Sequence, residues 1–204
     1  MRPADRIRHI YHTHAAAWPR RRRQDLMERP WLDRFLAALP DRRHVLDLGC
    51  ADGRPMAGYL IEQGCRITGV DVAPAMVARA QQTFPDQDWH VGDMRDWSGG
   101  SGYDGLLGWH SFFHLPPEDQ PRMIARFAAL TGPGGVVMFT SGTKRGEAYG
   151  EFEGERLYHG SLDRAEYSDQ LTAHGFEVLA HQVEDPDCGG ATVWLARKTT
   201  PGSQ

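Results

Sequence analysis

The feature that most constrains the fold of this chain is a regular alternation of short apolar runs and longer amphipathic segments. The apolar runs have the length and residue types of buried strands, and the segments between them are long enough for helices. The expected strands are residues 45–48, 66–71, 89–94, 103–109, 136–142, 176–184 and 191–198. This alternation predicts a doubly wound α/β sheet, with the last two segments as an antiparallel pair.

Helices are expected between these strands, over residues 54–63, 74–83, 118–130 and 163–175. Pro74 suits the first turn of its helix, and Asp163 with Glu166 three residues later fits a capping box. Two further helices, residues 4–17 and 31–39, form an N-terminal helical cap. The connector between them contains four arginines, Arg20 to Arg23. These arginines form either a nucleic-acid patch or a solvated connector on an otherwise acidic chain, and we favour the connector.

Length and composition limit the class of protein. A chain of 204 residues is enough for one domain with a full hydrophobic core. We expect a single domain over residues 1–204, with a helical cap (1–40), an α/β core (41–198) and a frayed polar tail (199–204). The net charge of −4 gives no reason to expect nucleic acid or a membrane as partner, and no apolar run approaches the ~20 residues of a membrane span. Three cysteines without a CxxC pair indicate neither a disulfide framework nor a zinc site, so we expect a reduced, cytoplasmic protein. We expect it to be a monomer or a homodimer.

The first strand leads into a glycine-rich loop, VLDLGCADGRP, residues 45–55. In a doubly wound sheet, ligands bind beyond the carboxyl ends of the strands, so this loop is the leading candidate site. A nucleotide P-loop is excluded because the chain has no Gly-Lys-Ser or Gly-Lys-Thr. A dinucleotide loop is disfavoured because Gly49, Ala51 and Gly53 have the wrong spacing. Asp47 and Asp52 would also lie near a dianionic pyrophosphate, which is unfavourable.

A ligand with positive charge and no phosphate suits this loop better. S-adenosylmethionine carries a sulfonium and an ammonium group, and tight glycine turns let the backbone pack against its methionine portion. Asp71 ends the second strand, where a carboxylate can accept both ribose hydroxyls. Asp93 follows the third strand, where it can accept a hydrogen bond from an adenine amino group. Each aspartate alone fits a cap or a turn, but Asp47, Asp71 and Asp93 at three successive strand ends favour this cofactor.

With these residues, the chain resembles the class I S-adenosylmethionine-dependent methyltransferases. VLDLGCADG is similar to the first motif of that family, GVDVAPAMV to the second and VGDM to the adenine-contacting segment. YDGLLGWHSFFHLPPED and LTGPGGVVMFTS resemble the segments around the fourth strand and before the fifth. The resemblance covers residues 5–198 and implies a seven-stranded, mostly parallel sheet with an antiparallel last strand. It is nearest to small bacterial enzymes that methylate small molecules, including tellurite-resistance-like methyltransferases.

The resemblance implies that the motifs and the N-terminal helix hold S-adenosylmethionine. The implied cofactor-binding residues are Asp47, Gly49, Cys50, Ala51, Gly53, Asp71, Val72, Asp93, Met94, Trp109, Tyr11 and Trp18. Ala51 departs from the usual glycine, which is the mildest change possible. For Trp109, a contact with adenine and a place in the core are equally open. The apolar spacing of the N-terminal helix, which includes Tyr11 and Trp18, also fits an amphipathic helix that merely packs on the sheet.

The candidate catalytic residues are His110, His159 and Tyr158. Methyl transfer is an in-line displacement, so alignment supplies most of the acceleration, and a base is needed only where the acceptor must lose a proton. The resemblance implies that His110 lies beside the cofactor. In a local helix, His110 and His114 would have the spacing of a zinc pair. The HExxH glutamate and a third ligand are absent, however, so we expect no metal and a packing role for His114.

Residues 140–162 form a long glycine-rich segment that contains Tyr158 and His159. Such a segment is typical of a lid or a binding loop, and the alternative is an edge hairpin with scattered exposed aromatics. Our interpretation is an S-adenosylmethionine-dependent methyltransferase that acts on an oxygen or nitrogen of a small molecule. The alternatives are a nucleic-acid methyltransferase, for which a [DNS]-P-P-[YFW] motif is missing, an NAD-dependent oxidoreductase, and a non-catalytic cofactor-binding module.

Overall fold

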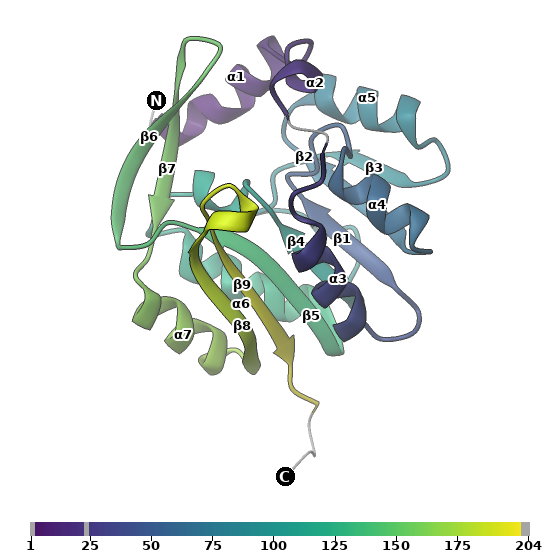
Figure 1. Ribbon diagram of the computed structural model, residues 1–204, viewed down its shortest axis with the longest axis vertical. Coiled ribbons are helices and arrows are strands. Elements are labelled where there is room, and N and C mark those ends of the chain that lie inside the picture. Colours follow the sequence, from purple (N-terminus) through teal and green to yellow (C-terminus); the bar gives the residue numbers. More distant parts are fainter. Residues whose placement is uncertain (1–2, 23–24, 201–204) are drawn as a thin grey trace.

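A computed structural model describes residues 3–22 and 25–200 and shows one central sheet with helices on both faces (Figure 1). Seven strands follow the order β3-β2-β1-β4-β5-β9-β8. Their bounds are β1 (His44–Leu48), β2 (Arg66–Asp71), β3 (Asp88–Val91), β4 (Tyr103–Gly108), β5 (Thr131–Ser141), β8 (Phe176–Asp185) and β9 (Ala191–Lys198). Strands β1 to β5 pair in parallel, and β9 lies antiparallel between β5 and β8. The predicted seven-stranded, mostly parallel sheet is confirmed.

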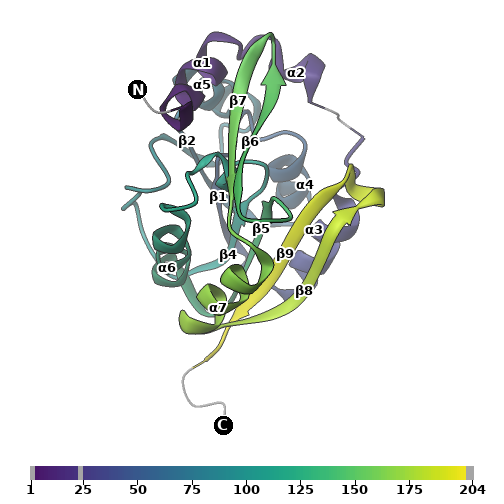
Figure 2. The ribbon, with the colours of Figure 1, turned by 90° about the vertical axis from the view of Figure 1, so that its left-hand side faces the viewer.

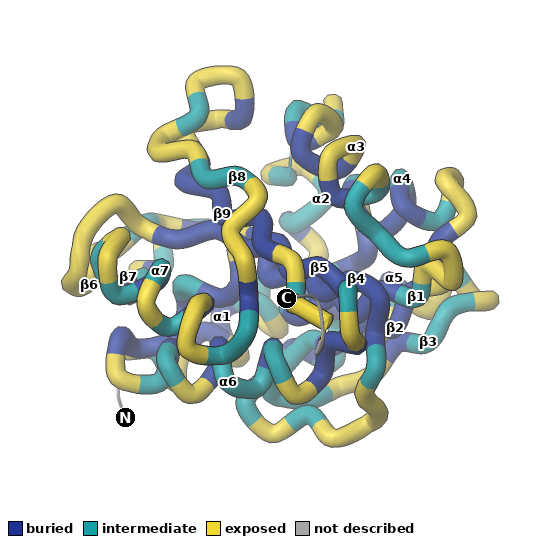
Figure 3. Tube along the Cα trace, turned by 90° about the horizontal axis from the view of Figure 1, so that it is seen from below, coloured by how far each residue is buried: buried dark blue, intermediate teal, exposed yellow. Residues whose placement is uncertain are grey.

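The helices cover the two faces of the sheet in separate groups. One face packs against α3 (Arg29–Ala38), α4 (Met56–Glu62) and α5 (Pro74–Thr83), and the other against α6 (Gln120–Leu130) and α7 (Arg164–Ala173). Adjacent residues of β1 face opposite ways, so Val45 joins the first apolar cluster and Leu46 the second. The central strands are therefore buried on both faces, while β8 at the edge is largely exposed (Figure 3). Among the described residues, no helix has the length and apolar character that crossing a membrane requires.

The N-terminal segment (residues 3–22) forms three short helices above the carboxyl ends of the strands. They are η1 (Pro3–Arg6), α1 (Ile7–Thr13) and α2 (Trp18–Arg21). The N-terminal cap is thus confirmed, but the single helix expected over residues 4–17 is wrong. Helix α1 ends at Thr13, because the N–H groups of Ala17 and Trp18 donate to the carbonyls of His14 and Ala15, three residues back, and the chain turns over residues 14–17. Part of the expected connector, Arg20 and Arg21, is helical, while Arg23 lies outside the described residues.

The segment after β5 folds into a hairpin of two strands, β6 (Gly146–Phe152) and β7 (Glu155–Ser161). The segment is thus a hairpin, as the alternative expected, but it forms a separate two-stranded sheet and not an edge of the main one. It rises from the sheet beside the N-terminal segment, as Figures 1 and 2 both show. The strand–helix boundaries elsewhere differ from expectation by a few residues, and the Asp163–Glu166 capping box is present. Two short turns complete the chain, η2 (Phe112–His114) and η3 (Pro186–Cys188).

Candidate functional site

The glycine-rich loop after β1 is shaped by three residues with left-handed backbone. Gly49, Ala51 and Gly53 have φ angles of 82°, 48° and 79°. The turn is held to β2 because the N–H groups of Gly49 and Cys50 both donate to the carbonyl of Val70, at 2.7 and 3.2 Å. Left-handed backbone favours glycine, so the loop needs small residues at alternate positions. The Gly-x-Ala-x-Gly pattern therefore follows from the left-handed backbone of this turn and is not a degenerate form of the dinucleotide-binding motif.

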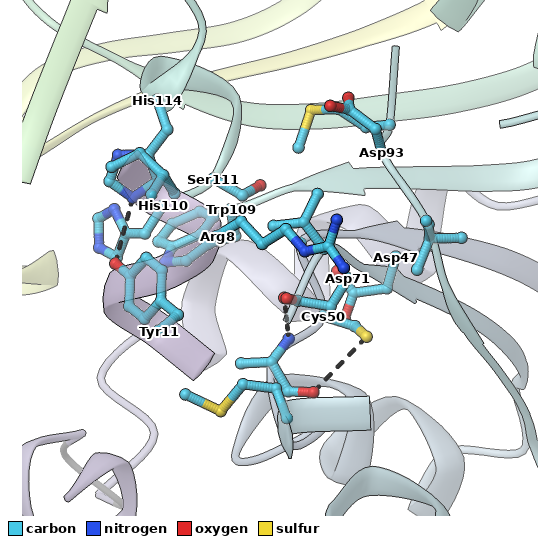
Figure 4. Close-up of a pocket in the computed structure, with 18 of the residues that line it drawn as sticks. Arg8, Tyr11, Asp47, Cys50, Asp71, Asp93, Trp109, His110, Ser111 and His114 are labelled. Atoms are coloured by element: carbon cyan, nitrogen blue, oxygen red, sulfur yellow. Dashed lines mark hydrogen bonds between the residues drawn. The ribbon is translucent and has the colours of Figure 1, made fainter. Parts of the chain in front are cut away.

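Asp71, at the end of β2, fixes both the loop and the next helix. One of its carboxylate oxygens accepts from the N–H of Ala51 at 3.0 Å, and the other accepts from the N–H of Ala73 at 2.8 Å. Each carboxylate oxygen has a second lone pair, so the group can still accept hydrogen bonds from a ligand. Asp47 and Asp93 lie near Asp71, because the ends of the three strands that carry these residues meet at one edge of the sheet (Figure 4).

A cavity of about 480 Å³ opens at this edge, and we call it the loop cavity. All twelve residues that the sequence assigns to the cofactor line it, together with others from the N-terminal segment and from the stretch after β4. Its predicted lining residues are Tyr11, Trp18, Asp47, Gly49, Cys50, Ala51, Gly53, Asp71, Val72, Asp93, Met94 and Trp109. The volume is within the range of small-molecule and cofactor sites.

The electrostatics of the loop cavity are unusual because two carboxylates lie close together in a buried place. Burial, with a smaller effect from the charge of Asp71, raises the pKa of Asp47 to about 7. Burial also raises the pKa of Asp71 to about 6, although the N–H groups of Ala73 and Ala51 oppose the shift. Within the described part of the chain, Asp47 accepts no hydrogen bond that would offset its burial. A ligand with a positive charge would stabilise both carboxylates.

Asp93 is held by an arginine at the opposite side of the loop cavity. Arg95 contacts the Asp93 carboxylate at 2.6 Å and reaches Asp119 at 3.2 Å. The hydrogen bonds from Arg95 outweigh burial and lower the pKa of Asp93. This carboxylate is therefore ionised and fixed in orientation, which suits a hydrogen-bond acceptor for a ligand amino group.

The N-terminal segment forms the roof of the loop cavity. Trp18 donates from its indole N–H to the buried carboxylate of Asp52 at 3.1 Å, which ties α2 to the glycine-rich loop. Tyr11 lies 5.6 Å from Trp18, ring centroid to ring centroid, and its hydroxyl bonds to His114. Figure 4 shows Arg8 reaching from α1 across the cavity toward Asp71 and Asp47. The amphipathic spacing of α1 therefore places polar groups over the site as well as apolar groups in the core.

A second cavity of about 420 Å³ adjoins the first, and we call it the hairpin cavity. The loop after β5, the base of the hairpin and the turn between β8 and β9 enclose it. His110 lines both cavities and is the point where they meet. Its backbone has a φ of 49°, and its N–H donates to the hydroxyl of Thr140 at 2.9 Å. The side chain of His110 is exposed to solvent through the open cavities, while the protein atoms packed around it, with a smaller effect of the Arg22 charge, lower its pKa below the usual range.

The other two predicted catalytic residues are adjacent in β7 but lie in different places. His159 lines the hairpin cavity, with its ring 4.6 Å from that of Phe113, centroid to centroid. Tyr158 lines neither cavity. Its side chain is buried in the apolar cluster between the hairpin and α1, and its hydroxyl donates to Glu147 at 2.8 Å. Neighbouring residues of a strand face opposite ways, so the structure places the side chains of Tyr158 and His159 on different faces of the hairpin.

The zinc-pair alternative for His110 and His114 does not fit the backbone. His110 is left-handed, and only Phe112–His114 form a single 3₁₀ turn, so the α-helical spacing that the pair needs does not form. Among the described residues, no group of three potential metal ligands comes together. His114 instead accepts from Tyr11 and contacts Tyr158, which is a polar packing role.

Several lining residues were missed by sequence reasoning. Arg8 had a usable signal, because it lies three residues before Tyr11 and therefore on the same face of α1. Ser111 had none: its hydroxyl donates to the carbonyl of Leu48 at 2.5 Å across 63 residues of sequence. Arg22 also lines the loop cavity and pairs with the buried Glu28 at 2.5 Å. The contact between Ser111 and Leu48 depends on the fold and leaves no local pattern in the sequence.

Comparison with known proteins agrees with this geometry. Residues 19–181 match a family model described as a methyltransferase domain. The carboxy-S-adenosyl-L-methionine synthase of Chromohalobacter salexigens is 39% identical over 106 residues, covering 48% of this chain and 39% of that protein. The trans-aconitate 2-methyltransferase of Escherichia coli is 33% identical over 108 residues, covering 50% of this chain and 41% of that protein. The chain thus spans about two fifths of the length of these curated relatives.

Solved structures show the same fold over nearly the whole chain. A 1,6-didemethyltoxoflavin-N1-methyltransferase from Burkholderia thailandensis is 26% identical with a TM-score of 0.71, covering 97% of this chain and 87% of that chain. A magnesium protoporphyrin IX methyltransferase from Synechocystis PCC 6803 has a TM-score of 0.74 over 98% of both chains. At 17% identity, this second likeness concerns the fold alone.

Proposed function

The chain belongs to the methyltransferase-domain family, the class I S-adenosylmethionine-dependent methyltransferases, and we propose that it methylates an oxygen or nitrogen of a small molecule. In this proposal the loop cavity holds S-adenosylmethionine and the hairpin cavity holds the acceptor. The observation that carries it is the position of His110, which lines both cavities at the point where they meet. A methyl donor and an acceptor in these two cavities would have their reacting groups beside one imidazole.

The residues of the loop cavity fit the cofactor chemically. Asp47 is a buried carboxylate without a hydrogen-bond donor in the described part of the chain, so a ligand with an ammonium and a sulfonium would relieve its unfavourable burial. We assign the ribose hydroxyls to Asp71 and the adenine amino group to Asp93, whose orientation Arg95 fixes. We assign the carboxylate of the methionine portion to Arg8, the cation that reaches into the cavity from α1.

The bound cofactor supplies an electrophilic methyl group, and the chain's own groups align and deprotonate the acceptor. The hairpin cavity positions the acceptor, which is the largest contribution that a protein makes to a displacement of this kind. In the tautomer with its hydrogen on Nδ1, His110 can donate to the hydroxyl oxygen of Thr140, 3.4 Å away, and Nε2 is then free to accept a proton. The lowered pKa keeps the imidazole of His110 neutral at physiological pH but also makes it a weak base, so we assign it a hydrogen bond from the acceptor and the removal only of an acidic acceptor proton. His159, on the wall formed by β7, is the second group placed to orient the acceptor.

The hairpin cavity indicates an acceptor of modest size with polar groups. Its volume of about 420 Å³ admits a small molecule, and its wall contains Lys144, Glu147 and Glu184 beside Phe113. A polymer would need an open groove with a net positive charge, whereas this wall carries both signs and the whole chain has a net charge of −4. We therefore propose that segment 140–162 encloses a metabolite rather than a nucleic acid.

Two measurements test the proposal in sequence. Calorimetry should show that S-adenosylhomocysteine binds with micromolar or better affinity, while NAD and ATP bind far more weakly. Incubation of a metabolite extract with isotopically labelled S-adenosylmethionine should then give a labelled small molecule, with an RNA fraction as the comparison. Tighter binding of NAD would contradict the assignment of the loop cavity. Label that appears only in RNA would contradict the small-molecule acceptor and leave the cofactor in place.

A further inference from the structure

We propose that His114 is a positioning residue that couples the two cavities, so that a cofactor in the loop cavity orders the wall of the hairpin cavity. This inference rests on the proposed function, because it concerns how the two sites of that reaction communicate. His114 is buried, lines the loop cavity, and lies between α1 and β7. It is not needed for the displacement itself, and it touches both of the elements that cover the site.

The hydrogen bonds of His114 fix its tautomer. Nδ1 lies 2.8 Å from the carbonyl oxygen of Tyr158, and because a carbonyl can only accept, Nδ1 carries the hydrogen. Nε2 is therefore the acceptor, and the hydroxyl of Tyr11 donates to it at 3.1 Å. The result is a directed chain from a side chain of α1, through one imidazole, to the backbone of β7 (Figure 4 shows the Tyr11–His114 bond). Both ring nitrogens are used, so the ring cannot rotate without losing bonds on both sides.

The two ends of this chain lead toward different cavities. Tyr11 lines the loop cavity, whereas His159, the residue after Tyr158, lines the hairpin cavity. The ring of His114 also lies 5.3 Å from that of His159 and 4.9 Å from that of Phe113, centroid to centroid. Phe113 is a second wall residue of the hairpin cavity. A shift of Tyr11 therefore reaches this wall through one intervening side chain.

The hairpin and the N-terminal segment are joined to each other more closely than either is to the sheet. A small apolar cluster contains Ile7 and Ile10 from α1 with Phe152, Leu157 and Tyr158 from the hairpin, and it is separate from the two clusters that pack on the sheet. Near the hairpin tip, two ion pairs also join the N-terminal segment to the hairpin: Arg6 with Glu155 at 2.7 Å, and Arg21 with Glu153. Exposed ion pairs contribute little, so the apolar cluster and the His114 bonds carry the connection.

A cofactor that contacts Tyr11 therefore stabilises one arrangement of α1, and with it one arrangement of the hairpin. Among the described residues, none from β6 or β7 lines the loop cavity, so any effect of the cofactor on the hairpin must be transmitted. By thermodynamic reciprocity, an acceptor in the hairpin cavity would tighten the cofactor by the same factor. The expected consequence is cooperative binding, in which each ligand raises the affinity of the protein for the other.

Amide hydrogen exchange of the hairpin tests this inference. S-adenosylhomocysteine is the probe, and no acceptor is needed. At saturation, the amides of residues 146–161 in the wild-type protein should exchange at least about fivefold more slowly than without the probe. Tyr11→Phe removes the one hydroxyl that donates to His114 and keeps the ring in the apolar cluster. In this variant, also at saturation, the slowing should fall below about twofold.

The matched control is Tyr149→Phe, which removes the hydroxyl of an exposed tyrosine that pairs with Tyr158 across the same hairpin and should keep the full wild-type slowing. His114→Asn provides a second variant, because its amide can still donate to the carbonyl of Tyr158 but cannot reach Tyr11; it should behave as Tyr11→Phe does. Unchanged hairpin exchange in the wild-type protein, despite calorimetric binding of the probe, would overturn the inference. Full slowing in Tyr11→Phe would do the same. Failure of the probe to bind at all would instead count against the proposed function.

Discussion

Ser111 occupies the space that a side chain at Gly49 would need. A Cβ built on Gly49 would overlap the Cβ of Ser111, and the Ser111 hydroxyl donates to the carbonyl of Leu48 at 2.5 Å. The end of β1 is thereby fixed against the segment that follows β4. The same segment carries His110, so the floor of the loop cavity and the junction of the two cavities are positioned by one close contact.

Replacement of Gly49 by alanine should therefore strongly destabilise the protein. The variant combines an overlap with Ser111 and a φ of 82°, and we expect a loss of about 2–5 kcal/mol of unfolding free energy. Chemical denaturation measures it, and calorimetry with S-adenosylhomocysteine should show no binding. Adding Ser111→Gly removes the overlapping atom and should restore part of the stability. A double variant no more stable than Gly49→Ala would contradict the contact as the cause.

Ala51→Gly should have the opposite effect. Ala51 has a φ of 48°, a conformation that costs a residue with a Cβ about 1–2 kcal/mol and glycine almost nothing. Part of this gain is offset because glycine has more freedom in the unfolded chain. We expect cofactor affinity at least equal to that of the wild-type protein and a stability change between zero and about +1 kcal/mol. A clear loss of affinity in calorimetry would mean that the methyl group of Ala51 itself contacts the ligand.

Asp47→Asn should raise the stability of the ligand-free protein at neutral pH and weaken its binding of the cofactor. Because folding raises the pKa of Asp47 from 3.8 to about 7, ionisation of this group favours the unfolded chain. Its destabilising effect is absent below pH 4, grows as the pH rises from 4 to 7 and is complete above 7. The asparagine variant without ligand should then be more stable than the wild-type protein at pH 8, by on the order of 3 kcal/mol, and not at pH 4.

The same variant should bind S-adenosylmethionine more weakly, because it has lost the charge that faces the cationic ligand. Denaturation curves at pH 4, 6 and 8 and calorimetry at pH 8 provide the measurements. A stability gain that does not depend on pH would show that the carboxylate is not the group that titrates.

His110 is best tested by His110→Asn, because asparagine tolerates the left-handed backbone at this position better than alanine does. If His110 is the base, kcat should fall by about 10²–10⁴-fold while the affinity for S-adenosylhomocysteine stays within about threefold. Because the pKa of His110 is lowered, the wild-type rate should not fall between pH 8 and pH 6 through protonation of this residue. Near wild-type kcat at saturating acceptor would remove His110 as the base and leave alignment as the main contribution.

Tyr158→Phe should change stability more than catalysis. The hydroxyl of Tyr158 bonds to Glu147 and lines neither cavity, so its loss should cost about 0.5–1.5 kcal/mol of unfolding free energy. The backbone carbonyl that His114 uses is unchanged in this variant. We expect kcat within about threefold of wild type, compared with the much larger loss for a base. A hundredfold fall in kcat with normal stability would show that the hydroxyl of Tyr158 takes part in catalysis.

Much of the cofactor site was predictable from sequence because parallel strands bring their carboxyl ends to one edge. Asp47, Asp71 and Asp93 are far apart in the chain, yet each follows an apolar run, and that pattern alone places them together. The small residues of the loop were predictable for a similar local reason. These features depend on secondary structure and strand order, which short-range patterns specify well.

The acceptor side was less predictable because it depends on contacts between distant segments. Sequence placed Tyr158 and His159 in the same segment, but it could not tell which of two neighbours in a strand faces the cavity. It also gave no sign that His110 is left-handed, which decides against a helical pair with His114. Ser111 was missed because its partner, the backbone carbonyl of Leu48, belongs to another strand end.

The separation of the hairpin from the main sheet has a consequence for how such an enzyme can change. The hairpin leaves the fold after Gly142 and returns at Leu162, and it packs on η2, η1 and α1 rather than on the strands that carry the aspartates. Its sequence can therefore diverge, or be exchanged as a unit, without disturbing the aspartates that line the loop cavity. The condition is that Phe152 and Leu157 keep their contacts with Ile7 and Ile10, and that position 158 keeps its backbone carbonyl toward His114. New acceptor specificities in this architecture should arise by replacement of this exchangeable module.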